Sequence, residues 1–374
     1  MRTATTTLIL CVGGLLALGI TMLYSSSMAR GGTHYLTMQG TWAAVGLAAC
    51  FIAALCDYRW LKKLTWPVYL LTALLLIAVL IPGIGIYKNG SRRWLDLGIT
   101  NFQPSEAAKL ALIIVLAYYG EKYQRQMRSF KGGLIIPGII IGPILALVFL
   151  EPDRGTTILL GAVAGVMLLL AGVRWHYFVP PAQVAAFGMA AALWSDPVRM
   201  RRILSWLDPE ATKDGAGYQA WQAMIALGSG GVSGLGIGNG RQKLGFVPEH
   251  HTDFIFSIIG EEMGMIATMG VVMGFIIFVL CGMYIAWHAR DVFGLLLAGG
   301  ITFLIGMQAF INIGVVTSAL PNKGLPLPFI SYGGSSLVLM LFAVGMLISV
   351  ARYGGAPVHE EDLEEADLRN TQFA

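Results

Sequence analysis

Long apolar runs are the feature that most limits how this chain can fold. They lie at residues 7–27, 37–56, 64–83, 104–120, 134–150, 155–172, 178–194, 264–287, 293–320 and 335–351. A helix needs about 20 mainly apolar residues to cross a hydrocarbon core about 30 Å thick, and these runs reach that length or fall slightly short of it. The 374 residues are 56% hydrophobic and 12% charged, a composition that excludes a soluble globular domain. We therefore expect an all-α polytopic membrane protein with about ten transmembrane helices and large extracytoplasmic loops.

The basic residues of the short loops predict the topology. Loops that carry Lys or Arg fall on the same side as the N-terminus, at residues 59–63, 122–131, 174 and 290. Cytoplasmic loops carry an excess of these residues, so this side is expected to be the cytoplasm. An even number of spans returns the chain to its starting side, and both termini should then be cytoplasmic. Residues 1–352 form the predicted membrane domain, and the acidic segment 353–374 is expected to be a disordered tail.

The predicted outer loops are long and carry many charges. They span residues 84–104, 195–253 and 321–335. Their basic residues, interleaved with tryptophans, include Arg92, Arg93, Arg241 and Lys243. Long loops can be translocated with their charges, so solvated surface explains any one of these residues. As a set they suit an anionic ligand at the membrane surface, such as a lipid phosphate, because Arg binds phosphate oxygens with two donors at once.

Charged residues also occur within or at the ends of the predicted spans. Glu106 and Lys109 are three residues apart, on one helix face, where an ion pair can neutralise itself. Asp153 lies near Glu151 just after the 134–150 run. A structural ion pair or a solvated turn explains either pair taken alone. Together the pairs predict a polar cavity that opens to the outer side.

Two patterns exclude classes of cofactor. The glycine run at 228–240 contains neither G-x-G-x-x-G nor a P-loop pattern, so no nucleotide site is expected. A tight turn beside a ligand and a plain linker both remain open for this run. His250 and His251 are adjacent and cannot share a helix face, and the four cysteines form no C-x-x-C motif. No zinc or redox centre is therefore predicted.

The segment GFVPEHHTDFIF, at 245–256, puts Asp253 at the edge of a predicted span. Asp is a favoured N-cap, so capping of a helix that starts at Phe254 is one explanation. A carboxylate whose pKa is raised by burial can also serve as a general base. The later segment LPNKGLPLPFISYGGSS has three prolines within eight residues and cannot form a continuous helix. It predicts either a structural hinge or a stiff loop that lines a cavity, with Lys323 directed into it.

Three long segments resemble the SEDS family (shape, elongation, division and sporulation) of bacterial polytopic membrane proteins. They are NGSRRWLDLGITNFQPSEAAKLAL, YQAWQAMIALGSGGVSGLGIGNGRQKLGFVPEHHTDFIFSIIGEEMG and ALPNKGLPLPFISYGGSSLV. The resemblance extends from about the first span to about residue 352. Within the family, GIGNGRQKLGFVPEHHTDFIF and MLYSSS are more similar to the cell-division member than to the elongation member. The chain departs from the family pattern at Arg154 and Gly240, neither of which is the motif Asp.

The resemblance implies a peptidoglycan glycosyltransferase that polymerises lipid II into β-1,4 glycan strands at the outer face of the bacterial cytoplasmic membrane, at the division septum. Implied partners are lipid II, the nascent glycan strand, membrane lipid, a class B penicillin-binding protein as transpeptidase, and divisome proteins; nucleic acid is not expected. Asp253 matches the catalytic Asp of the H-T-D-F motif. The substrate-binding residues expected beside it are Glu106, Lys109, Arg92, Arg93, Asp153, Arg241, Lys243, His251, Lys323 and Ser331.

The chemistry agrees with such a site. Lipid II is an α-linked sugar pyrophosphate and the product is β-linked, so the anomeric carbon inverts and no covalent sugar intermediate is needed. Asp253 would take the proton of the acceptor hydroxyl as general base, and cations would stabilise the leaving pyrophosphate. No cofactor is required, although Mg²⁺ or Mn²⁺ could bridge the pyrophosphate to a carboxylate near Asp253.

Other functions remain open. A lipid II flippase would use the same polar cavity to move a headgroup across the membrane. The two halves of the chain show no obvious inverted repeat, and the chemistry-bearing motifs gather on the outer side, which favours an enzyme. A scaffold that only recruits a synthase would not need Asp253. An elongation-type polymerase differs from the division type in few loop residues.

Overall fold

The computed structural model describes residues 1–27, 34–88, 91–96, 98, 101–184, 187–188, 200, 204–215, 217–245, 252–322 and 324–354. Its α-helices are α1 (Arg2–Ser27), α2 (His34–Leu55), α3 (Trp60–Leu80), α4 (Pro104–Lys122), α5 (Ile136–Leu150), α6 (Arg154–Leu170), α9 (Tyr218–Gly230), α10 (Ile255–Trp287), α11 (Val292–Val316) and α12 (Gly334–Gly354). The strands are β1 (Gly85–Lys88), β2 (Ser91–Asp96) and β3 (Asn101–Phe102). Short helical turns cover Gln124–Gln126, Lys131–Ile135, Trp175–Phe178 and Gln242–Leu244.

The helices form a membrane-type bundle, as expected. Within the described ranges, seven helical segments are long and apolar enough to cross a membrane: α1, α2, α3, the segment Lys131–Leu150 that contains α5, α10, α11 and α12. α6 is apolar but has 17 residues, and α4 has 19 residues and includes the charged Glu106 and Lys109. The predicted run at 178–194 lies partly outside the described residues. Every other predicted run coincides with one of these helices, so the all-α polytopic class is confirmed.

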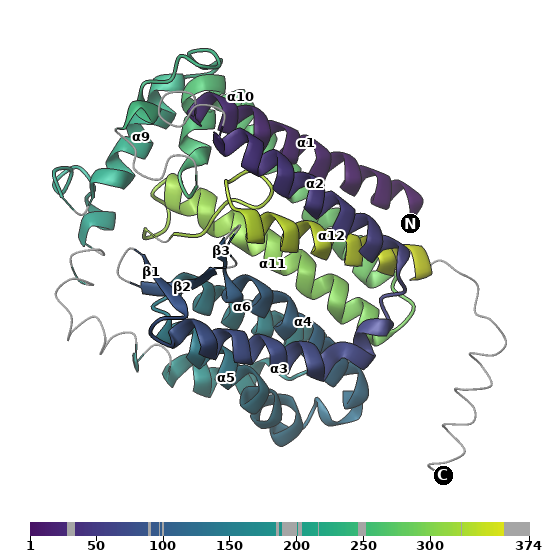
Figure 1. The fold of residues 1–374 in the computed structure, drawn as a ribbon. Coiled ribbons are helices and arrows are strands. Elements are labelled where there is room, and N and C mark those ends of the chain that lie inside the picture. Colours follow the sequence, from purple (N-terminus) through teal and green to yellow (C-terminus); the bar gives the residue numbers. More distant parts are fainter. Residues whose placement is uncertain are drawn as a thin grey trace, which may run out of the picture.

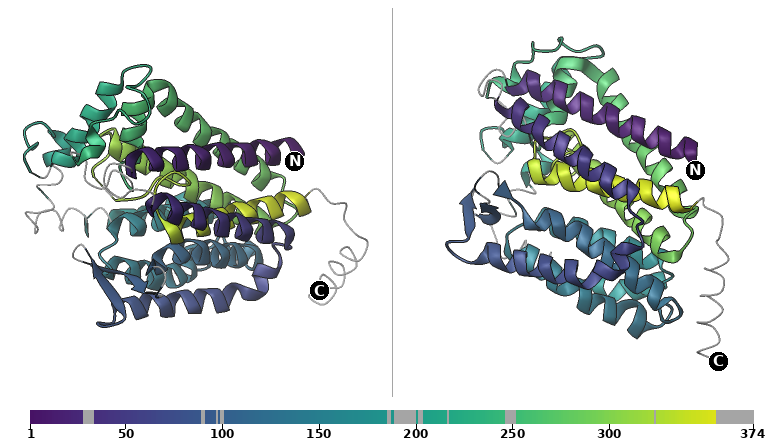
Figure 2. Two further views of the ribbon diagram at one scale, coloured as in Figure 1. Left: turned by 45° about the horizontal axis from the view of Figure 1, so that its top comes forward. Right: turned by 45° about the vertical axis from the view of Figure 1, so that its right-hand side comes forward.

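The core of the bundle is formed by α4, α11 and α12. α11 contacts α4, α6, α10 and α12, and most of its residues are buried. α1 packs against α10, α2 against α12, and α3 against α4 around this centre (Figures 1 and 2). Buried positions on α4 occur on all of its faces. The helix is thus enclosed by other parts of the protein, and for this reason it shows almost no amphipathic pattern.

The two ends of the bundle differ. The sheet and α9 lie at one end, and the N-terminus lies at the other (Figure 1). Gly354, the last described residue, lies beside Met1: a Cβ built on it would be 3.2 Å from Cε of Met1. The described chain therefore begins and ends on one side of the bundle.

A polar cluster joins the helices at the end that holds the N-terminus. The ammonium of Lys62 bonds Glu121, at 2.8 Å, and Asp291, at 3.0 Å. Asp291 also accepts from Tyr58 Oη, at 2.8 Å, and caps α11 through the backbone N–H of Gly294. These contacts connect the α2–α3 turn, the end of α4 and the α10–α11 turn. Partial burial raises the pKa of Asp291, but the charge of Lys62 and the hydrogen bond donated by the Gly294 N–H outweigh it, so the pKa is lowered.

The outer loop predicted at 84–104 contains a small sheet that the sequence analysis did not anticipate. β1 and β2 form an antiparallel hairpin with an irregularity between Ile86 and Tyr87, and β3 pairs with the other edge of β2. The sequence SRRWLD shows no polar–apolar alternation, and within β2 only Leu95 is buried. The sheet packs against α3 and α4, and Arg93 on β2 reaches the turn that follows α5.

The glycine run contacts a break in α10. Gly264 adopts φ 73° and ψ −170° inside that helix, a conformation that favours glycine. Backbone N–H groups of Leu235 and Gly236 donate to the carbonyls of Glu261 and Glu262, at 3.0 and 2.9 Å. A Cβ on Gly264 would clash with the backbone at Gly234. The run is therefore not a plain linker, because it packs closely against another backbone segment of the same protein; its approach to a ligand stays a prediction.

Candidate functional site

Asp253 lies half-buried in the turn that precedes α10. The helix begins at Ile255, and its N-cap is Phe254, which makes no side-chain capping hydrogen bond. The helix therefore starts one residue later than expected, and Asp253 lies one position before its N-cap. The backbone carbonyl of Asp253 accepts a hydrogen bond from Asn312 Nδ2 on α11, at 2.8 Å.

The loop between α11 and α12 holds the same turn from the other side. Ser331 Oγ donates to the carbonyl of Thr252, at 2.6 Å, and accepts from the backbone N–H of Leu327, at 2.8 Å. Ser331 was predicted to bind substrate. In the described structure the Ser331 hydroxyl bonds the protein backbone, and these hydrogen bonds fix Thr252 beside Asp253.

Gly324 of this loop lies against the carboxylate of Asp253. A Cβ built on Gly324 would be 2.7 Å from Oδ2 of Asp253 and 3.7 Å from its Cγ. The proline-rich segment is therefore a shaped loop next to the candidate catalytic carboxylate and not a distant hinge. Lys323 and His251, two predicted substrate-binding residues, lie outside the described residues.

Glu106 and Lys109 form the ion pair that their spacing predicted. Lys109 Nζ is 2.7 Å from Glu106 Oε1, and both side chains are nearly inaccessible, at 0% and 3%. Lys109 also donates to Gln308 Oε1 on α11, at 2.9 Å. Gln308 in turn donates to the carbonyl of Pro326 in the α11–α12 loop, at 2.8 Å. The pair on α4 is thus connected through α11 to the loop that contacts Asp253.

Arg93 binds the turn between α5 and α6. Its guanidinium donates to the carbonyls of Glu151 and Pro152, at 3.0 and 2.7 Å. Asp153 caps α6 by accepting from the backbone N–H and the hydroxyl of Thr156. A Cβ on Gly155, in the first turn of α6, would touch Leu325 at 3.4 Å, so this turn borders the same loop.

Glu151 is fully buried, and neither of its carboxyl oxygens has a hydrogen-bond partner in the described structure. Burial raises the pKa of Glu151 to about 8; the nearby charge of Asp153 adds to this effect and Arg93 opposes it. At neutral pH Glu151 is therefore a neutral carboxylic acid, at the end of the bundle that carries the sheet.

Lys243 and Arg241 occupy a different place from the one their predicted role suggested. Lys243 is buried, and its ammonium bonds Glu262 at 2.6 Å, Ser25 at 3.0 Å and the Gly238 carbonyl at 2.8 Å. The backbone N–H of Arg241 donates to Glu261, at 2.8 Å, and its side chain is exposed. These contacts fold the 228–244 segment onto α1 and α10. Lys243 would have to leave three protein partners to bind an anion.

Arg92 lies on β2 with its guanidinium carbon 5.9 Å from the centre of the Tyr87 ring. The contacts in the structure do not connect it, Arg241 or Lys243 to Asp253. Gly324 of the α11–α12 loop lies against the carboxylate, and Asn312 of α11 bonds the backbone of Asp253.

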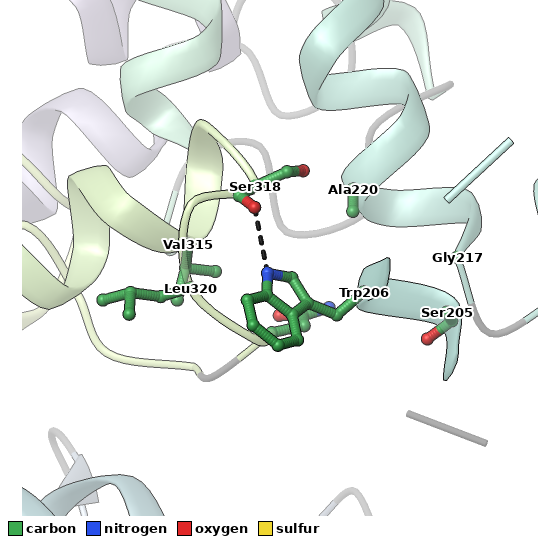
Figure 3. A pocket seen from close by; sticks show the side chains of 8 residues that line it. Ser205, Trp206, Gly217, Ala220, Val315, Ser318 and Leu320 are labelled. Atoms are coloured by element: carbon green, nitrogen blue, oxygen red, sulfur yellow. Dashed lines mark hydrogen bonds between the residues drawn. The ribbon is translucent and has the colours of Figure 1, made fainter. Parts of the chain in front are cut away.

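Trp206, in the loop predicted at 195–253, contacts the chain just after the end of α11. Its indole Nε1 donates to the carbonyl of Ser318, at 2.9 Å (Figure 3). A cavity of about 10 Å³ beside this contact, lined also by Ala220 and Leu320, has room for one water molecule at most. This tryptophan therefore contributes to the attachment of the loop, and the cavity beside it is too small for a sugar.

Gln308 and Asn312 were missed in the sequence analysis. They are one helical turn apart in an otherwise apolar run, so they share a face, and polar amides inside a span generally face the protein interior. That signal was available in the 293–320 run. Among the described residues, no three His, Cys, Asp or Glu side chains form a group that could hold a metal ion. The Mg²⁺ or Mn²⁺ near Asp253 stays a prediction that would depend on substrate oxygens for most of its ligands.

Comparison with known proteins identifies relatives over nearly the whole chain. A family model described as "Cell cycle protein", which covers FtsW, RodA and SpoVE proteins, matches residues 5–355. The probable peptidoglycan glycosyltransferase FtsW of Geobacter metallireducens is 41% identical over 357 residues, which cover 94% of this chain and 95% of that protein. Stage V sporulation protein E of Bacillus subtilis is 39% identical over 347 residues, covering 91% and 94%.

Solved structures agree with the fold. A chain of a peptidoglycan synthase complex, described for its coordination of polymerization and crosslinking, superposes with a TM-score of 0.81 at 28% identity, covering 94% of this chain and 98% of that one. The crystal structure of the rod shape determining protein RodA of Thermus thermophilus gives a TM-score of 0.70 at 27% identity, covering 94% and 97%.

Proposed function

This chain belongs to the SEDS family, and we propose that it is a peptidoglycan glycosyltransferase that polymerises lipid II during cell division. The relatives named peptidoglycan glycosyltransferase match nearly its full length. One observation supports placing the active site at Asp253. This residue is held by Asn312 and lies against Gly324, at the end of the bundle that bears the predicted outer loops.

Asp253 acts as the general base in this proposal. The acceptor sugar presents a hydroxyl to the carboxylate, which takes its proton as the oxygen attacks the anomeric carbon of the donor. The leaving group is the lipid pyrophosphate, and cations near the site stabilise its charge. Arg92, Arg93, Lys323 and the buried Lys109 are the basic residues that we assign to the donor's side. Lys109 is the least accessible of them, so it would act through the positive electrostatic potential that it adds to the site and not by direct contact with substrate.

The membrane setting follows from the lipid anchors of both substrates. We place the end that carries the sheet and α9 on the outer face of the cytoplasmic membrane, at the septum, and both termini in the cytoplasm. The contact between Met1 and Gly354 supports termini on one side. The basic residues of the opposite loops support the cytoplasmic assignment of that side.

A class B penicillin-binding protein is the proposed partner. The superposed chain comes from a synthase complex that coordinates polymerization and crosslinking, and this chain matches it over 94% of its length. Divisome proteins are the further partners expected of a division enzyme. Mg²⁺ or Mn²⁺ is proposed only as a bridge between pyrophosphate and carboxylate.

The test is polymerisation of fluorescent lipid II by the purified full-length protein, with and without its cognate transpeptidase. Asp253→Ala should reduce glycan synthesis by roughly 10²–10⁴-fold, the usual contribution of a general base, at unchanged thermal stability. Asp208→Ala is the matched control, because Asp208 is exposed in the same outer loop. Full polymerisation by Asp253→Ala would contradict the catalytic role and direct the next assay to headgroup translocation.

A further inference from the structure

One amide group connects the two segments that meet at the candidate catalytic carboxylate. Asn312 Nδ2 donates to the carbonyl of Asp253, at 2.8 Å, and to the carbonyl of Leu325, at 2.6 Å. Asp253 belongs to the turn before α10, and Leu325 follows Gly324 in the α11–α12 loop. Both hydrogens of one nitrogen are therefore used to hold two loops side by side.

The chemistry of the two partners fixes the orientation of the amide. Both are carbonyl oxygens and can only accept, so the nitrogen must face them and the oxygen must point away. Asn312 is 1% exposed, and its Oδ1 has no hydrogen-bond partner in the described structure. A buried amide oxygen without a donor costs free energy. This cost argues against a side chain retained for stability alone.

The hydrogen bonds of Asn312 also differ from those of Gln308, its neighbour on the same face of α11. Gln308 bonds the next loop carbonyl, that of Pro326, and accepts from Lys109, so its hydrogen bonds hold the loop and α4 and not the Asp253 turn. Ser331 holds Thr252 and the loop backbone at Leu327. In the described structure, Asn312 is the side chain that bonds both the backbone of Asp253 and the loop that carries Gly324.

We propose that Asn312 is a positioning residue for glycosyl transfer: it fixes the Asp253 backbone to the α11–α12 loop and so sets where the carboxylate points. This inference rests on the proposed function. Asn312 does not touch substrate. It keeps the base within hydrogen-bond reach of the acceptor hydroxyl, and a displacement of about 1 Å at a catalytic group can cost about 10²-fold in rate.

Asn312→Asp tests the proposal because it keeps the shape of the side chain and removes the donors. An ionised carboxylate would face two carbonyl oxygens, whereas a protonated one has a single O–H to donate. With lipid II and the cognate transpeptidase, we expect kcat to fall about 10–100-fold at neutral pH, with a small change in KM. The ratio of variant to wild-type rate should rise as pH is lowered, since protonation restores one of the two hydrogen bonds.

The matched control is Thr302→Val. Thr302 is also buried on α11 and donates to a carbonyl, that of Ala298, but it lies more than two turns from Asn312. This variant should retain the wild-type kcat and pH profile. If Asn312→Asp does not fold, Asn312→Ser, whose hydroxyl can donate one hydrogen bond, should fold and show an intermediate loss of kcat.

Hydrogen exchange separates failure of this inference from failure of the proposed function. Amides at 252–254 and those of Gly324, Leu325 and Leu327 should exchange faster in Asn312→Asp than in wild type or Thr302→Val, whether or not lipid II is the substrate. Wild-type kcat and unchanged exchange in the folded variant would overturn the proposal. Polymerisation that is unaffected by Asp253→Ala would instead overturn the role of Asp253. Faster exchange in Asn312→Asp would still support the proposal that Asn312 fixes the Asp253 backbone to the α11–α12 loop.

Discussion

Oδ2 of Asp253 lies 2.7 Å from the point where a Cβ on Gly324 would sit. That separation is shorter than the van der Waals contact of a carbon and an oxygen, so the two positions are matched: the loop has no side chain where the carboxylate needs room. Glycine is required here by a close approach to a functional group. The adjacent Leu325 is the residue whose carbonyl Asn312 holds.

Gly324→Ala should displace the carboxylate and lower the rate of glycan polymerisation about 10–100-fold, because the base moves relative to the acceptor. Gly333→Ala is the control in the same loop. A Cβ on Gly333 would meet its nearest atom, Cβ of Ser336, at 3.6 Å, an ordinary contact. Lipid II polymerisation by both folded variants is the measurement, and equal activity would show that the contact at Gly324 is of no consequence for catalysis.

Removing one member of the Glu106–Lys109 pair should destabilise the protein strongly. Lys109→Met leaves a buried carboxylate without its cation, and the expected loss is about 3–5 kcal/mol. The double variant Glu106→Gln with Lys109→Met should recover much of it, because no charge is then left unpaired. Lys122→Met, at the exposed end of the same helix, is the control. Thermal unfolding in detergent measures wild type and the three variants, and a double variant no more stable than Lys109→Met would argue against a coupled pair.

Gly264→Ala should destabilise the protein by about 1–3 kcal/mol, since an alanine would be held at a positive φ and its Cβ would meet the glycine segment. Gly270→Ala on the same helix has open space at the Cβ position and should stay within about 1 kcal/mol of wild type. Limited proteolysis of the 228–244 segment gives a second readout. Equal stability of the two variants would mean that the break in α10 is not maintained by the contact with Gly234.

Glu151 should make stability depend on pH. Its folded pKa, about 8, is raised above the ordinary value of 4.5, so its contribution is present below the ordinary value and is lost as pH rises through the folded one. Glu151→Gln cannot ionise. The variant should therefore gain thermal stability relative to wild type as pH is raised between about pH 5 and pH 9. Glu210→Gln, at an exposed position in the large outer loop, should follow the wild-type profile. If thermal stability depends on pH in the same way in wild type and Glu151→Gln, the raised pKa of Glu151 is contradicted.

The membrane class, the approximate positions of the helices and the Glu106–Lys109 pair could all be predicted from the sequence. The length of an apolar run and the i,i+3 spacing of two charges are local properties of the sequence. A long apolar run forms a helix wherever it crosses the bilayer, and residues three apart on that helix share a face. Asp253 was recognised through its motif. The start of α10 was misjudged by one residue, because helix ends depend on the capping geometry and the contacts of the first turn.

Contacts between distant residues could not be predicted in this way. Asn312 is 59 residues from Asp253, and Ser331 is 79 residues from Thr252. The lysine expected to bind phosphate, Lys243, is neutralised by Glu262 and held by Ser25, which is 218 residues away. A span pattern gives the length and polarity of a helix, but not which neighbour faces each polar side chain. The membrane-spanning helices and the candidate Asp253 can thus be read from local sequence, whereas the placement of the Asp253 carboxylate follows from how α10, α11 and the α11–α12 loop pack together.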